Sequence, residues 1–165
     1  MSDFGKVLFI MGVSGTGKST IGTMVSESLG VPFYDGDDFH PEENIKKMSA
    51  GLPLDDNDRQ GWLEKLNALA KEQKSKGAVI ACSALKERYR EILRNEIEGF
   101  VHFIYLEGSF ELIKSRMELR KGHFMPAELL KSQFETLEPP TDAINVSISH
   151  PPEKIVQLIL DQTQW

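Results

Sequence analysis

The sequence predicts a single α/β domain, residues 1–165, in which a mostly parallel sheet of about five strands carries helices on both faces. Three observations lead to this prediction. Short apolar runs alternate with helical patterns along the chain, which is typical of a parallel sheet. The clearest runs are apolar at every position, as expected for strands covered on both faces. The chain has the length of one domain, and no repeat, low-complexity tract or linker divides it.

The expected strands are short runs rich in apolar residues. Residues 7–11 form the first run, which is wholly apolar, and residues 78–82 form the clearest interior run after it. Weaker runs at residues 31–34, 100–106 and 144–148 complete the expected sheet. A helical pattern separates each strand from the next, so parallel crossovers are the natural connection.

The expected helices show apolar residues at spacings of three and four, with capping residues at their ends. Asp55 and Asp58, for example, suit the positive end of a helix that begins around them. The predicted helices are a first one ending near Gly30, a short one within residues 41–53, a longer one that starts at about 55–58 and ends just before Gly77, one from Ser83 onward, one from about 109 to 121, one ending at Leu137 and a last one starting at Pro151.

Charge and composition exclude several classes of protein. The 19 basic and 25 acidic residues give a net charge of −6, the opposite of a general nucleic-acid binder, so no nucleic-acid partner is expected. No apolar stretch reaches the roughly 18 residues of a membrane-spanning helix, so no membrane partner is expected either. The N-terminal segment has neither a basic region nor a cleavage site, and the single cysteine, Cys82, cannot form an internal disulfide. We therefore expect a cytoplasmic protein.

Residues 12–19, GVSGTGKS, fit the pattern G-x-x-x-x-G-K-[ST] and lie between the first expected strand and the first expected helix. In this phosphate loop, glycines let the backbone N–H groups point at phosphate oxygens, and the helix adds the positive end of its dipole. Lys18 can reach the β- and γ-phosphates, and the Ser19 hydroxyl can ligate Mg²⁺. A plain strand-to-helix turn is the alternative. The motif predicts a nucleotide site and a three-layer P-loop NTPase fold.

Residues 35–38, DGDD, form an acid turn directly after the second expected strand. The carboxyl ends of parallel strands are where ligands of such sheets bind. One acid there can hold Mg²⁺, and another can accept a proton from an attacking hydroxyl. An acidic surface turn is the alternative, because Asp and Gly are common turn residues. The run at 78–82 ends without an aspartate, which favours Asp35 and Asp37 for the two roles.

Basic side chains stand where an anionic ligand could use them. Arg59 lies near the start of its helix, and Lys86 and Arg90 are four apart, so we expect them to share a helix face. Arg116 and Arg120 repeat that spacing just before a polar loop. Two arginines leading into such a loop suit a lid, roughly residues 109–137, that closes over a transferring phosphate. A solvated surface is the alternative for each of them.

Four blocks of the sequence resemble the bacterial-type gluconate kinases: GVSGTGKS, DGDDFHPEENIKKMSAGLPLDDNDRQGWL, CSALKERYREILR and GHFMPAELLKSQFETLEPP. The resemblance covers nearly the whole chain, and its second and third blocks are far more specific than the phosphate loop. It implies a homodimeric P-loop small-molecule kinase that uses ATP and Mg²⁺ to phosphorylate D-gluconate at its 6-hydroxyl. A shikimate-type or nucleoside-monophosphate-type kinase on the same scaffold is the alternative. A nucleotide-dependent switch is a second alternative, although the N-K-x-D segment of guanine-specific switches is absent.

The resemblance also implies a role for each candidate residue. The ATP phosphates would be held by Gly12, Val13, Ser14, Gly15, Thr16, Gly17, Lys18, Ser19 and Thr20. Asp35 and Ser19 would bind Mg²⁺, and Asp37 would bind the substrate hydroxyl and accept its proton. By analogy with the kinases that resemble shikimate kinase, Arg59 and Ser83 would line the substrate pocket, and Arg116 and Arg120 would act from the lid. We also expect His40, Lys86 and Arg90 at the substrate pocket, where Lys86 or Arg90 would join Arg59 in pairing with the substrate carboxylate.

Overall fold

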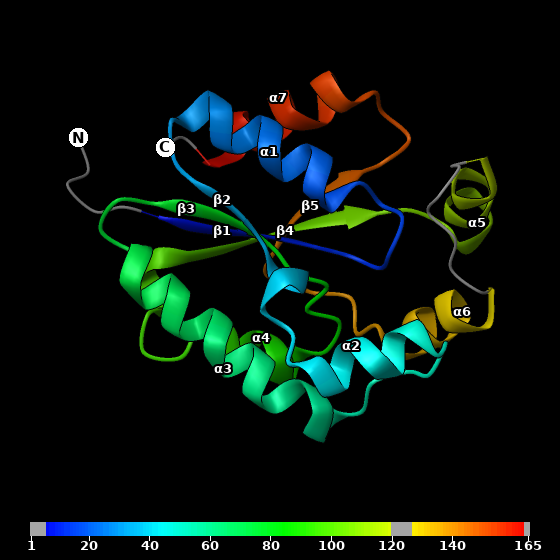
Figure 1. Cartoon of the computed structure of the whole chain (residues 1–165). Helices are drawn as coiled ribbons and strands as arrows, with labels where there is room; N and C mark the ends of the chain where they lie inside the picture. Colours follow the sequence, from blue (N-terminus) through cyan, green and yellow to red (C-terminus); the bar gives the residue numbers. More distant parts are fainter. Residues whose placement is uncertain (1–5, 120–126, 164–165) are drawn as a thin grey trace.

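The computed structural model describes residues 6–119 and 127–163. Within these ranges, a five-stranded parallel sheet has the order β2-β3-β1-β4-β5 (Figure 1). The strands are β1 Val7–Met11, β2 Phe33–Asp35, β3 Ala78–Ala81, β4 Val101–Glu107 and β5 Ile144–Ser147. The sequence-based prediction of a parallel α/β sheet is confirmed.

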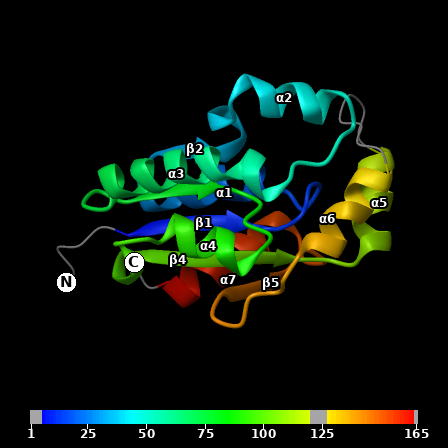
Figure 2. The same cartoon turned by 90° about the horizontal axis from the view of Figure 1, so that it is seen from below.

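Helices cover both faces of the sheet. In Figure 1, α1 (Lys18–Leu29) and α7 (Pro152–Thr163) lie above it, while α3 (Asp56–Gln73) and α4 (Glu87–Leu93) lie below it. The remaining helices are α2 (Glu42–Ser49), α5 (Phe110–Leu119), α6 (Ala127–Thr136) and two short 3₁₀ helices, η1 (Gly36–Phe39) and η2 (Glu98–Phe100). Figure 2 shows that α5 and α6 lie beyond the arrowheads of the strands, at the edge where ligands bind.

The core is built from the strand residues that the sequence marked as apolar. Every residue of β1 is fully buried, and β3 is buried throughout. Phe9 and Phe103 stack on neighbouring strands with ring centroids 5.4 Å apart. A strand with apolar residues on both faces requires cover on both, which α1 and α7 provide on one side and α3 and α4 on the other.

The start of α3 is held by a reciprocal cap, as the acidic residues there predict. The Asp55 carboxylate accepts the Asp58 N–H at 2.7 Å, and the Asp58 carboxylate accepts the Asp55 N–H at 2.9 Å. Such a capping box satisfies two N–H groups that a helix start otherwise leaves unpaired. It begins α3 at Asp56, so that Arg59 lies in the first turn, facing the carboxyl edge of the sheet.

Among the described residues, no helix is both long and apolar enough to cross a lipid bilayer.

Candidate active site

A cavity of about 540 Å³ opens at the carboxyl edge of the sheet. Its walls come from the phosphate loop, the acid turn, the segment that joins α2 to α3, the end of β3 and helix α6. The sequence-predicted residues that line it are Ser14, Gly15, Gly17, Lys18, Ser19, Thr20, Asp35, Asp37, His40, Arg59 and Ser83. Residues far apart in the chain therefore meet here, because β1, β2 and β3 end at the same edge.

The phosphate loop curls between β1 and α1. Gly17 has a φ of 90°, in the left-handed region that glycine adopts without strain. Thr16 Oγ1 donates to the Val13 carbonyl at 3.0 Å and braces the curve from within. Gly12, Val13 and Thr16 are buried behind the loop and do not line the cavity. Any part these three take in binding phosphate must come from their backbone.

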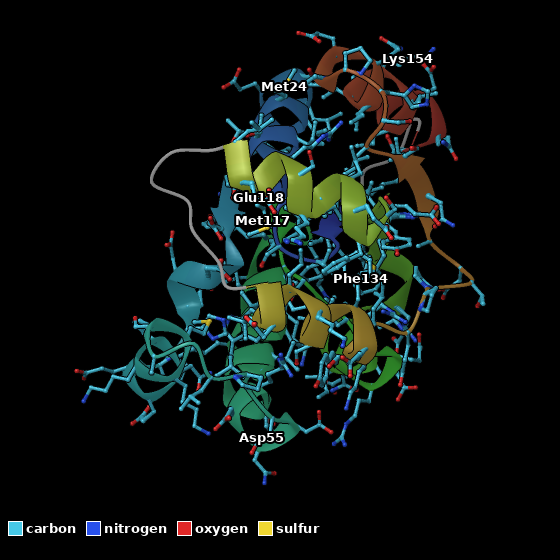
Figure 3. The ribbon with its side chains drawn as sticks, turned by 90° about the vertical axis from the view of Figure 1, so that its right-hand side faces the viewer. Met24, Asp55, Met117, Glu118, Phe134 and Lys154 are labelled. Carbon is cyan, nitrogen blue, oxygen red and sulfur yellow. The ribbon has the colours of Figure 1, made fainter. Side chains whose placement is uncertain are left out.

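Gly15 is the point where the phosphate loop meets α5. Its φ is 85°, and a Cβ atom there would lie 2.8 Å from Met117 Cγ and 2.9 Å from Ile113 Cγ2. Figure 3 shows α5 and α6 side by side and labels Met117 on α5 and Phe134 on α6. The Phe134 ring meets Phe110 of α5 edge to face, with centroids 5.7 Å apart. A side chain at Gly15 would therefore collide with α5, and glycine fits at this point of the loop.

Lys18 folds over the loop that precedes it. Its Nζ donates to the carbonyls of Gly12 and Val13, each at 3.0 Å. Burial lowers the pKa of Lys18, and the nearby carboxylate of Asp37 opposes that shift. A lysine held at the loop in this way can transfer its hydrogen bonds to phosphate oxygens when a nucleotide enters.

Ser19 and Asp35 form a pair of oxygen donors at the start of α1. Ser19 Oγ donates to Asp35 Oδ2 at 3.0 Å, and the other carboxylate oxygen accepts the Asp37 N–H at 3.0 Å. Mg²⁺ prefers hard oxygen ligands and keeps most of its shell as water and phosphate, so one hydroxyl and one carboxylate suit it. The described residues contain no group of three or more His, Cys, Asp or Glu side chains that could hold a metal by themselves. The pair fits a metal that arrives with the nucleotide.

Asp37 stands in η1, opposite Lys18, and its position depends on Gly36. A Cβ on Gly36 would lie 2.3 Å from the Ala81 carbonyl oxygen, so only glycine lets η1 pack this tightly on β3. Trp62 Nε1 donates to the Gly36 carbonyl at 2.7 Å and holds the turn from the other side. The Asp37 side chain remains 79% exposed to the open cleft. Desolvation by the cleft walls raises the pKa of Asp37, and Lys18 opposes the rise.

Arg59 is the cation of the cavity's other end. Its Nη1 donates to the Leu54 carbonyl at 2.7 Å and to the Tyr89 hydroxyl at 3.0 Å, and its guanidinium lies 5.3 Å from the Tyr89 ring centroid. The Tyr89 hydroxyl in turn donates to Asp56. These contacts use one edge of the guanidinium and leave its fork free to pair with a carboxylate.

Ser83 and Cys82 form the floor of the cavity at the end of β3. The Ser83 carbonyl accepts the Gly12 N–H at 3.2 Å and so ties this strand end to the phosphate loop. Burial raises the pKa of Cys82 to about 12, which keeps its thiol protonated. Cys82 is thus a small packing residue, as its place at a strand end suggests.

Lys86 and Arg90 were predicted to line the substrate pocket, and the structure places both elsewhere. Lys86 caps α4 and pairs with Asp56 at 3.1 Å, outside the cavity. Arg90 is 1% exposed, and it donates to the carbonyls of Ala84 at 2.7 Å and Glu138 at 2.8 Å. Its donors bind the chain that follows β3 to the chain that follows α6, so Arg90 is structural in this arrangement.

The two arginines expected in the lid have different outcomes. Arg116 of α5 donates to the Ile148 carbonyl at 2.8 Å, just past β5, and does not line the cavity. Arg120 lies outside the described residues.

Sequence reasoning missed Gln133 of α6, which lines the cavity. Its Oε1 accepts the Ser14 N–H at 2.7 Å, and its Nε2 donates to Ser14 Oγ at 3.1 Å. It therefore ties α6 directly to the phosphate loop. Sequence reasoning also missed Asn44, which is buried beside His40. Neither residue carries a charge or a motif spacing that could have singled it out.

Comparison with known proteins agrees with this geometry. The shikimate kinase family model matches residues 14–162. The thermosensitive gluconokinase of Escherichia coli is 49% identical over 152 residues, which cover 88% of this chain and 81% of that protein. The thermoresistant gluconokinase of the same organism is 46% identical, covering 91% of this chain and 89% of the relative.

Solved structures give the same result. A gluconokinase from Sinorhizobium meliloti is 42% identical with a TM-score of 0.88, covering 95% of this chain and 90% of that chain. Shikimate kinase from Aquifex aeolicus, at 20% identity and a TM-score of 0.64, shares the fold. The chain therefore belongs to the gluconokinase family, within the group of kinases that the shikimate kinase model describes.

Proposed function

We propose that this protein transfers the γ-phosphoryl group of ATP to the 6-hydroxyl of D-gluconate, giving 6-phospho-D-gluconate and ADP. The observation that carries the proposal is one cavity with a phosphate loop at one end, an arginine fork at the other and a carboxylate between them. The identity of the acceptor as gluconate is inferred from relatives named gluconokinase, which are 42–49% identical over most of the chain.

The nucleotide end neutralises charge. The loop N–H groups and Lys18 would bind the β- and γ-phosphates, with Ser19 and Asp35 as the residues that would hold Mg²⁺. Bound Mg²⁺ supplies further positive charge to these phosphates. Ser14 must release Gln133 if its N–H is to reach a phosphate oxygen.

The acceptor end orients gluconate. The fork of Arg59 would pair with the gluconate carboxylate. Asp37 would accept the proton of the 6-hydroxyl while the oxygen of that hydroxyl forms a bond to the γ-phosphorus. The bond from that phosphorus to the bridging oxygen of ADP breaks in the same step. Arg59 would also place gluconate at a fixed distance from the phosphate loop, since its contacts to Leu54 and Tyr89 hold it still.

The segment 109–137 would act as the lid of a single domain. Its described part touches the phosphate loop at two places, Met117 against Gly15 and Gln133 against Ser14. Closure of a lid excludes water, which would otherwise take the phosphoryl group. Arg116 and Arg120 would contribute positive charge from this segment.

We further propose that the protein is a cytoplasmic homodimer. Size-exclusion chromatography with light scattering tests the oligomeric state.

A side-by-side assay of ADP release with gluconate, shikimate and AMP tests the function. We expect turnover with gluconate and at least about a hundredfold lower kcat/KM with the other two, because a differently shaped acceptor leaves Arg59 or Asp37 unpaired. Absence of turnover with gluconate would refute the proposal, and turnover with shikimate would favour the shikimate-type alternative that the family model admits.

A further inference from the structure

A buried amide lies behind the acceptor end of the cavity. Asn44 of α2 is 2% exposed, and its Nδ2 lies 2.8 Å from the Asp58 carbonyl oxygen and 3.1 Å from His40 Nδ1. A backbone carbonyl can only accept, so the atom of Asn44 that faces it must be the NH₂ nitrogen. The second hydrogen of that nitrogen then points at His40 Nδ1, which has to accept it.

This contact decides the tautomer of His40. A neutral imidazole that accepts at Nδ1 carries its proton on Nε2. His40 lines the cavity together with Asp37, and its Nε2 lies 3.8 Å from Asp37 Oδ1, which is too long for a hydrogen bond. Within the part of the chain that the structure describes, this N–H makes no hydrogen bond. It is available to a ligand that binds beside Asp37.

The ring is also held in place. His40 stacks on Trp62 with centroids 4.0 Å apart and planes 19° from parallel. The same indole holds Gly36, and with it the backbone that carries Asp37. His40, Asp37 and Asn44 are thus fixed relative to one another through α3.

The surroundings keep the imidazole neutral. The groups near it are Asp37 from η1, Arg59 from α3 and the ion pair of Lys47 with Asp58, 2.8 Å long, which joins α2 to α3. Burial and the positive charge of Arg59 lower the pKa of His40 to about 4. A neutral donor does not compete with Arg59 for a carboxylate, but it can donate to a hydroxyl.

We propose that Asn44 is a positioning residue that keeps His40 in the Nε2–H form, so that His40 donates a hydrogen bond to the hydroxyl next to the reacting one. The identity of that ligand, a polyhydroxy acid, rests on the proposed function. The cavity then distinguishes its substrate by two features, a carboxylate at Arg59 and a second hydroxyl at His40. A hydroxy acid with a single hydroxyl group would pair with Arg59 but would leave His40 without a partner.

Side-chain ¹⁵N NMR of the free protein tests the tautomer without any assay of activity. At pH 7 we expect His40 as the neutral Nε2–H form in the wild type. In Asn44→Asp, the new carboxylate can only accept, so we expect the proton of the neutral ring to move from Nε2 to Nδ1, which removes the donor at Nε2. A wild-type His40 with its proton on Nδ1, or doubly protonated, would overturn the proposal whether or not the protein phosphorylates gluconate.

Kinetics of the same variant test the consequence. Asn44→Asp should raise KM for gluconate about tenfold and leave KM for ATP unchanged, as expected for the loss of one hydrogen bond to the acceptor. The matched control is Asn67→Asp, because Asn67 is also buried and its Nδ2 donates to two carbonyls, of Leu93 at 2.9 Å and Asn95 at 3.1 Å.

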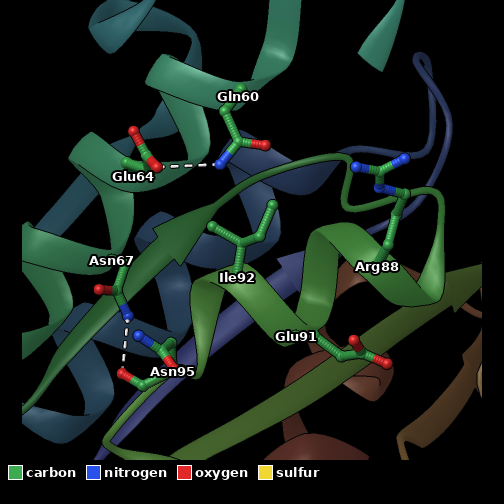
Figure 4. Close-up of a pocket in the computed structure, with 7 residues that line it drawn as sticks. All are labelled: Gln60, Glu64, Asn67, Arg88, Glu91, Ile92 and Asn95. Carbon is green, nitrogen blue, oxygen red and sulfur yellow. Dashed lines mark hydrogen bonds between the residues drawn. The ribbon is translucent and has the colours of Figure 1, made fainter. Parts of the chain in front are cut away.

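Figure 4 shows Asn67 and Asn95 in a pocket between α3 and α4, and His40 does not line this pocket. Asn67→Asp should lower the free energy of unfolding to a similar degree, with KM for gluconate and the His40 spectrum unchanged. If both variants raised KM for gluconate equally, or neither did, the positioning role of Asn44 would be refuted. Should Asn44→Asp not fold, the wild-type spectrum and the milder Asn44→Ser variant decide the question.

Discussion

The two ends of the cavity are built in different ways. The phosphate end is one continuous segment, residues 12–19, whose ligand groups are mainly backbone N–H groups at a helix start. The acceptor end combines η1, α2, α3 and the end of β3, and other residues hold its parts in place: Asn44 contacts His40, Tyr89 contacts Arg59 and Trp62 holds the Gly36 backbone. A site made of backbone is preserved as long as its glycines are. A site made of side chains depends on every contact behind it.

Lys18→Ala tests the phosphate end and should have the largest effect. Loss of its charge at the β- and γ-phosphates removes transition-state stabilisation, so we expect kcat/KM to fall by about 10³-fold or more. Steady-state ADP release measures this fall. Lys46→Ala is the control, because Lys46 is 74% exposed and, among the residues that the structure describes, pairs only with Glu42 on its own helix. Gluconate-dependent ATP consumption that survives in Lys18→Ala would contradict the assignment of this loop.

Asp37→Asn tests the point where the two ends meet. The amide keeps the shape of the side chain but cannot take the hydroxyl proton, so kcat should fall by about 10²- to 10⁴-fold with little change in either KM. Asp38→Asn is the matched control, since Asp38 is the exposed neighbour in the same turn and does not line the cavity. Equal losses of kcat in both variants would mean that the total charge of the acid turn matters and that Asp37 has no specific role as a base.

Arg59→Lys tests the acceptor end alone. Lysine keeps the positive charge but lacks the fork, so KM for gluconate should rise about tenfold while KM for ATP stays constant. Initial-rate kinetics with each substrate varied in turn separate the two constants. The control is Arg88→Lys, because Arg88 pairs with Asp56 at 3.0 Å on the outer side of the same network. A parallel rise in KM for ATP would show that Arg59 does not act on the acceptor alone.

The smallest effect concerns the pH dependence of stability at the acceptor end. The pKa of His40 is about 4 in the folded protein and near 6.5 without these surroundings. Between these values the unfolded state binds the proton first, so stability is complete above pH 6.5 and is lost as the pH falls towards 4. The loss should amount to about 1 kcal/mol between pH 7 and about pH 5.5.

Urea unfolding of wild type and His40→Gln over this pH range measures that contribution. The glutamine variant should lose less stability on acidification than the wild type does. His150→Gln, at an exposed position, should follow the wild type. Identical pH dependence in all three proteins would mean that His40 is not held neutral by its surroundings.

Arg90 illustrates why spacing alone could not complete the acceptor end. Lys86 and Arg90 are four apart, which places two helical residues on one face. The helix α4 begins only at Glu87, so Lys86 stands before it and turns towards Asp56, while Arg90 enters the core. Two neutral residues also contact the site, Gln133 at Ser14 and Asn44 at His40, and no charge pattern in the sequence predicts these contacts.

The sequence by itself determined the parallel α/β fold, the phosphate loop and the acid turn. Each depends on local patterns: strand hydrophobicity, glycine placement and the position of a residue relative to a strand end. Tertiary structure alone decided that Arg59 faces the cavity, that Asn44 lies against His40 and that α5 and α6 touch the phosphate loop. Those outcomes depend on contacts between residues up to 119 positions apart, such as Gln133 with Ser14, and the direction of a side chain follows from what it packs against.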